Sequence, residues 1–104
     1  MPRTNTQHAP EFIRNLLPFT TNGALSGYWA GATYVVNSYT TAIAAVTPDG
    51  VAALLTARYS RTTTQHQTIA AGALSGLAIV NIDSPAEFTK ATGQHARQTT
   101  KGTN

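Results

Sequence analysis

The segment from residue 58 to residue 66, RYSRTTTQH, gathers the residue types that bind anions. Two arginines, one serine and three threonines run directly into an apolar pattern with helical spacing. The N-terminus of a helix presents unpaired N–H groups and a partial positive charge, and both favour phosphate. Arginines and hydroxyls can add charge-assisted hydrogen bonds to the same group. The sequence therefore predicts a nucleic-acid-binding or anion-binding site made of Arg58, Tyr59, Ser60, Arg61, Thr62, Thr63, Thr64 and His66.

The same segment has a simpler structural interpretation, which the sequence slightly favours. Thr62 and Gln65 fit the Ser/Thr-x-x-Glu/Gln capping box, in which each side chain bonds the other residue's backbone N–H. In that case Thr62 only begins a helix, and Arg58 and Arg61 face water.

A catalytic role for His66 is the third interpretation, with Ser60 or a neighbouring threonine as the nucleophile. Such a site also needs a carboxylate to orient the histidine and donors for an oxyanion. None of the acidic residues lies near this segment in the sequence. They are Glu11, Asp49, Asp83 and Glu87. We therefore expect a protein that is not an enzyme.

Metal and cofactor binding also lack a sequence signal. The chain has no cysteine, and its histidines, His8, His66 and His95, are too widely spaced to form a paired-ligand motif. We expect no metal site and no cofactor.

Aromatic residues on or beside the predicted strands could form a stacking surface for bases. Sheet-borne aromatic side chains stack bases when cations nearby contact the backbone. A small sheet also needs aromatic side chains in its core, so we expect Trp29 and Tyr34 to be buried. Tyr39 and Tyr59 are flanked by hydroxyl-bearing residues, which makes them the candidates for exposure, and Tyr39 is the possible stacking residue.

The composition is that of one small domain with few charges. The chain has 104 residues, of which 41% are hydrophobic and 11% are charged, and its net charge is +3. Globular domains usually have about 25% charged residues. A balance of this kind tolerates a polyanionic partner without specifying one. The sequence contains neither a run of apolar residues typical of a signal peptide nor one long enough to span a membrane, so we expect no membrane contact and a cytoplasmic location.

The first half of the chain predicts one helix followed by a meander of strands. In APEFIRNLLPF, Pro10 suits the first turn of a helix and Glu11 complements its N-terminus. Strands are expected at about 24–30, 33–38, 41–47 and 51–57, with TPDG as a turn between the last two. The alternative is a helix across AAVTPDGVAALLTARY, which is rich in alanine and leucine. The turn and the flanking valines favour the hairpin.

The second half predicts a main helix at about 62–75, a strand at LAIVNI and a short helix that begins after Ser84 and ends at Gly93. Gly72 either weakens the main helix or marks close packing on the sheet. The expected fold class is α+β, a small antiparallel β-meander packed by one main helix with short helices near each end. Residues 9–93 form the domain, 1–8 a disordered arm and 94–104 a flexible, weakly basic tail.

Two motifs resemble those of a family of small uncharacterised phage-encoded domains. YVVNSYTTAIA matches a YVVxSYxTxIA strand pair and YSRTTTQHQ matches a YSxTTxxHQ segment that enters a helix. The resemblance covers about residues 19–88. Asn37 and Thr40 stand where the family pattern has an aromatic residue and a glycine, and residues 42–57 contain many alanines. The resemblance implies a phage origin and a compact α+β domain, and it brings no established activity.

These observations lead to one expected function and two alternatives. We expect a non-catalytic, phage-type accessory binding module that contacts nucleic acid or phosphate through residues 58–66. The first alternative is a protein-binding inhibitor of a host defence system or host process. The second is a minor virion or assembly component. The sequence leaves open whether the partner is nucleic acid or a host protein.

Overall fold

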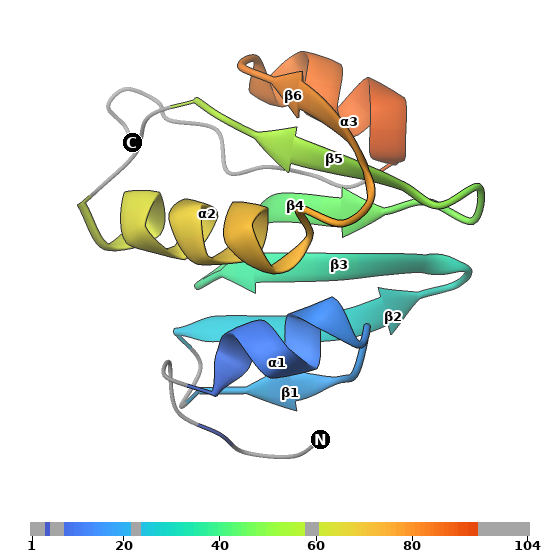
Figure 1. Ribbon diagram of the computed structural model, residues 1–104. Coiled ribbons are helices and arrows are strands. Elements are labelled where there is room, and N and C mark those ends of the chain that lie inside the picture. The colour runs from blue at the N-terminus through green and yellow to red at the C-terminus, as the bar shows by residue number, and fades with distance from the viewer. Residues whose placement is uncertain (1–3, 5–7, 22–23, 58–60, 94–104) are drawn as a thin grey trace.

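A computed structural model describes residues 4, 8–21, 24–57 and 61–93 of the chain. The described part contains three helices and one six-stranded sheet (Figure 1). In chain order the elements are α1 (Ala9–Arg14), β1 (Phe19–Thr20), β2 (Leu25–Ala30), β3 (Thr33–Ser38), β4 (Thr41–Val46), β5 (Val51–Leu55), α2 (Arg61–Ala73), β6 (Ala78–Ile82) and α3 (Pro85–Thr92). The predicted arm and tail lie outside the described residues, apart from Thr4 and His8.

The spatial order of the strands follows the chain, β1-β2-β3-β4-β5-β6. The first five strands form an antiparallel meander, and β6 pairs with β5 in parallel. A parallel neighbour requires a crossover connection, and α2 provides it. Helices α1 and α2 lie on one face of the sheet and α3 on the other (Figure 1). The α+β fold class is therefore confirmed.

The predicted meander is confirmed, and the helical alternative for residues 44–59 is wrong. Both β4 and β5 are strands, joined by the expected turn at Thr47–Gly50. The Gly50 N–H donates to the Thr47 carbonyl oxygen at 2.9 Å, and Gly50 adopts a φ of 84°, which glycine tolerates best. Alanine and leucine favour a helix in isolation, but here the turn and the pairing with neighbouring strands decide the structure.

The bounds of the elements differ from the sequence prediction at β1 and at α2. The short strand β1 was not predicted, because two residues are too few to give a pattern. Helix α2 begins at Arg61 rather than at Thr62 and ends at Ala73 rather than at residue 75. Thr62 is thus a helical residue and not the N-cap, so the predicted Thr62–Gln65 capping box is wrong. The N-cap position of α2 lies outside the described residues.

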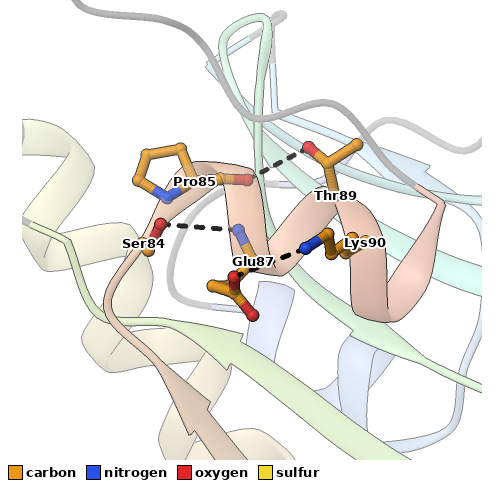
Figure 2. Close-up of polar contacts among 5 residues, drawn as sticks. All are labelled: Ser84, Pro85, Glu87, Thr89 and Lys90. Carbon is orange, nitrogen blue, oxygen red and sulfur yellow. Dashed lines mark hydrogen bonds and ion pairs between the residues drawn. The ribbon is translucent and has the colours of Figure 1, made fainter.

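Helix α3 has the predicted start and stop (Figure 2). Ser84 is the N-cap, and its hydroxyl accepts a hydrogen bond from the Glu87 N–H at 3.4 Å. The Glu87 carboxylate lies 3.9 Å from Lys90 Nζ, in an exposed pair of little energetic weight. Gly93 ends the helix in the left-handed conformation, with a φ of 77°.

The core has two layers, one on each face of the sheet, and β4 contributes to both. All six residues of β4 are buried. Ile43, Ala44 and Val46 pack with the side chains of α1 and α2, whereas Ala42 and Ala45 pack with Phe88 of α3. The small residues of TAIAAV thus match a strand with no solvent-facing side.

Tyr34 and Trp29 attach the segment after α1 to the sheet. Tyr34 is fully buried, and its hydroxyl donates to the Leu17 carbonyl oxygen at 2.8 Å. Burial raises the pKa of this hydroxyl. The Trp29 ring is 46% exposed, so the expectation that it is buried is wrong. It packs edge-on against Tyr34, with ring centroids 5.5 Å apart, while its N–H donates to the Leu16 carbonyl oxygen at 3.1 Å.

Gly27 and Gly72 make a matched pair of stability predictions. A Cβ at Gly27 would collide with the Tyr34 hydroxyl and lie 2.6 Å from Phe19 Cε1, whereas nothing lies within 4 Å of a Cβ at Gly72. We expect Gly27→Ala to lower the free energy of unfolding by about 1–3 kcal/mol through overpacking. Gly72→Ala, in the interior of α2, should raise it by about 0.5–1 kcal/mol. Urea denaturation measures both, and a neutral Gly27→Ala would contradict the close contact.

Candidate functional site

The C-terminal end of β3 meets the first two turns of α2 in a buried polar cluster of Ser38, Thr63 and His66. Ser38 Oγ lies 2.7 Å from His66 Nδ1, and it donates to Thr63 Oγ1 at 3.2 Å. All three side chains are nearly inaccessible to solvent, and Ser38 is 1% exposed. Because Thr63 and His66 are three positions apart in α2, one helix face presents both to the same strand residue.

The contact between Ser38 and His66 is a hydrogen bond whose donor depends on the tautomer of the ring. With a proton on Nδ1 the ring donates to Ser38 Oγ, and with the proton on Nε2 it accepts the Ser38 proton. Burial lowers the pKa of His66 below its ordinary value of 6.5 and so favours the neutral ring.

Tyr39 lies beside this cluster at the end of β3. Its φ of 56° is unusual for a residue other than glycine, and its N–H donates to the Ala24 carbonyl oxygen at 2.7 Å. The ring is 49% exposed, as the sequence predicts, and its centroid lies 6.1 Å from that of His66. Tyr39 thus lies beside the histidine ring with about half of its surface accessible to solvent, and its role as a stacking residue stays a prediction.

The geometry of the cluster does not suit nucleophilic catalysis. Ser38 is 1% exposed and His66 is buried beside it, so neither side chain can reach a substrate. No carboxylate bonds the imidazole in the part of the chain that is described. The cluster instead fixes α2 on β3. Sequence reasoning placed Ser60 near His66 and missed Ser38, since 28 residues separate the two partners and no local pattern connects them.

The structure divides the predicted anion-binding residues into three groups. Arg58, Tyr59 and Ser60 lie outside the described residues. Thr63 and His66 are buried against Ser38. The residues at the solvent-facing start of α2 are Arg61, Thr62 and Thr64, and the first turn of α2 contains no acidic residue.

The described residues contain no group of three or more histidines and carboxylates that could hold a metal ion. His8 is exposed near α1, and His95 lies outside the described ranges. Nor does any helix among residues 8–21, 24–57 and 61–93 have the length and apolar character needed to cross a bilayer.

A second candidate site is the free edge of the sheet at β6. Three large apolar side chains at or just before this strand are exposed, Leu77, Ile79 and Val80, and Val80 is 47% exposed. Within the described residues β6 pairs with β5 alone. The sequence did signal this surface, because LAIVNI has apolar side chains on both faces of the strand and no charge, but that pattern is also typical of a buried central strand.

A shallow apolar hollow adjoins this edge on the α3 face of the sheet. Its volume is about 420 Å³, and residues of β5, β6 and α3 line it together with the β4–β5 turn. Val51 and Ala53 contribute from β5, and Val80 and Ile82 from β6. The uncovered apolar surface therefore extends from the strand edge onto one face.

Comparison with known proteins identifies a family for most of the chain. A family model, described as a family of unknown function (DUF8033), matches residues 4–75, which is more than half of the chain. The matched part ends after α2, so β6 and α3 lie beyond it. Searches of curated proteins and of solved structures found no match.

Removal of the Ser38 hydroxyl tests the structural role of the buried cluster. Ser38→Ala leaves His66 Nδ1 buried without its hydrogen-bond partner, so we expect the free energy of unfolding to fall by about 1–3 kcal/mol. Ser75→Ala, at an exposed serine, should change it by no more than about 0.5 kcal/mol. Equal effects of the two substitutions in urea denaturation would rule out the proposed role.

The lowered pKa of His66 predicts a pH dependence of stability. The unfolded chain binds a proton at His66 near pH 6.5, whereas the folded chain binds it only at lower pH. The contribution of His66 is therefore fully present above about pH 6.5 and is lost as the pH falls towards the folded pKa. Thermal unfolding from pH 7.5 to pH 5 should show a decline in Tm that His66→Gln reduces. The same decline in both proteins would show that other groups cause it.

Proposed function

The chain belongs to the DUF8033 family, whose function is unknown, and we propose that this member is a non-catalytic binding module that contacts another protein chain through the free edge at β6. The proposal depends on one observation, an edge strand whose apolar side chains are exposed on both faces. Soluble proteins usually protect such edges with charges, proline, bulges or a covering segment. The stretch from Leu77 to Ile82 contains neither charge nor proline.

The contact would form by strand addition. The outer backbone groups of β6 have no partner strand in the described part of the chain, so an extended segment can bond to them and extend the sheet. Its side chains would alternate between the two faces of the sheet. On the α3 face they would meet Val80 and the adjoining hollow, and on the α2 face they would meet Ile79 and Asn81.

Phosphate or nucleic-acid binding at the start of α2 is the second candidate function. Arg61, Thr62 and Thr64 are exposed there, no carboxylate occupies the first turn, and the chain has a net charge of +3. These features support an anion at the helix N-terminus. Thr63 and His66 are buried against Ser38, so the anion-binding site would have fewer residues than the sequence predicts.

A phage origin, which the motif resemblance suggests, would place either activity inside an infected host cell. A β6 contact with a host protein would suit an inhibitor of a host defence or host process, and a contact with another phage protein would suit a virion or assembly component. Both alternatives use the same edge.

Affinity capture in cells that contain the natural partners tests both candidate functions. The tagged wild-type chain and the tagged Val80→Lys variant are each captured with and without nuclease treatment. Mass spectrometry identifies the proteins that are captured with them, and untagged copies of the chain count as partners. We expect Val80→Lys to capture at least tenfold less of a nuclease-resistant partner than the wild-type chain does, because a desolvated lysine disrupts an apolar strand contact.

Ala32→Lys is the matched control, since it adds the same charge at an exposed turn between β2 and β3 and should keep the partner. If no nuclease-resistant partner depends on Val80, the β6 proposal fails. A partner that nuclease removes, and that Arg61→Ala weakens, would support the second candidate instead.

A further inference from the structure

We propose that the segment which adds to β6 is β6 of a second copy of this chain, paired antiparallel so that Val80 of each copy lies at the two-fold axis. This inference depends on the proposed function, because it names the partner of the same edge. It predicts a symmetric dimer with a continuous sheet of both copies.

Helix α2 leaves space for this partner on one face of the edge. It packs over β3, β4 and β5, and β6 is the outermost strand of the sheet (Figure 1). On the other face α3 contacts β5 and β6, and its Phe88 side chain is buried among side chains of β3, β4 and β5. A strand at the usual spacing of about 4.8 Å from β6 would extend the sheet beyond α2 and would lie beside α3 on the opposite face.

The two edges of the sheet differ in a way that favours β6. Strand β1, at the other edge, has two residues, and the Thr4 N–H donates to the Thr20 carbonyl oxygen at 2.8 Å. The β6 edge has five residues and no such contact among those described. A second copy has the same unprotected edge and is present at the same concentration wherever the chain is made.

The sequence of β6 is complementary to itself in the antiparallel register centred on Val80. This register pairs Val80 with Val80, Ile79 with Asn81, and Ala78 with Ile82. Ala53 and Leu55 of the α3-side core pair with Val80 and Ile82, so the α3 face of the new contact is entirely apolar. Such cross-strand apolar pairs are the unit of sheet stabilisation.

Charge and shape fit the same register. The pairing places Asp83 opposite Leu77, so the two Asp83 carboxylates lie at opposite ends of the contact and do not repel each other across the axis. The small side chain of Ala78 stands opposite the partner's Ile82. Ala78 pairs with Val51, which lines the apolar hollow, so the isoleucine lies beside that hollow.

Sedimentation of the purified chain tests the dimer. The wild-type chain should show a concentration-dependent monomer–dimer equilibrium, because one pair of five-residue strands is a small interface. Val80→Lys should be monomeric at the highest concentration tested, and Ala32→Lys should behave as the wild type. Circular dichroism verifies that each variant is folded, which the 47% exposure of Val80 favours.

Disulfide crosslinking tests the register of the two β6 strands independently of Val80→Lys. The chain has no cysteine, so each introduced cysteine is the only thiol in its chain. Opposite residues of an antiparallel pair have Cα atoms about 4.5–5.5 Å apart, within the range that a disulfide spans. Val80→Cys should crosslink to itself under mild oxidation, and Ala78→Cys should crosslink to Ile82→Cys in a mixture. Ala78→Cys alone should not, because its two copies would lie about 13 Å apart along the strands.

The outcomes separate this inference from the proposed function. A wild-type chain that stays monomeric, or a dimer that Val80→Lys leaves intact, overturns the second copy as the partner of β6. If Ala32→Cys crosslinks as fast as Val80→Cys, the second copy is also ruled out as the partner of β6. If affinity capture still gives a foreign protein that depends on Val80, the proposed function stands with a different partner. If neither capture nor dimerisation depends on Val80, both fail.

Discussion

The burial of β4 on both faces is the constraint on which the rest of the structure depends. A strand with no solvent-facing side needs a packed layer above and below it. Helices α1 and α2 supply one layer and α3 supplies the other. Because α2 must cross the sheet on one face, the strand after it returns parallel to β5 and becomes the outermost strand. The exposed position of β6 is thus a consequence of how the centre of the sheet is covered.

Helix α2 is held in this position by polar as well as apolar contacts. Ala70, Ala73 and Leu74 pack into the core, and His66 and Thr63 bond Ser38 at the end of β3. Gln67 adds a side-chain bond to the Leu55 carbonyl oxygen at 2.6 Å, at the end of β5. Apolar packing alone would allow a helix rich in alanine to slide or rotate. Directional bonds to two strands select one position, because a displaced helix would leave these groups buried and unpaired.

The sequence predicts the local elements of this fold well and its long-range contacts poorly. The TPDG turn, the Ser84 cap and the glycine at position 93 act on their immediate neighbours, so their effects can be inferred from a few residues. The contact of Ser38 with His66 depends on how β3 and α2 meet, and no local pattern contains that information. Trp29 illustrates the same limit, since its exposure depends on α1 packing against the sheet beside it. The apolar run at β6 predicted a strand, but not its position at the edge.

The unequal edges of the sheet also determine how far an assembly could grow. A sheet with two open edges can add copies without end and form a fibre. Here the edge at β1 is short and holds a backbone contact from Thr4, which leaves β6 as the long open edge of the described chain. If two β6 strands pair, both open edges are used, so the dimer has closed symmetry and its remaining sheet edges are the two at β1. If β6 pairs as proposed, the same edge geometry would therefore also stop assembly at the dimer.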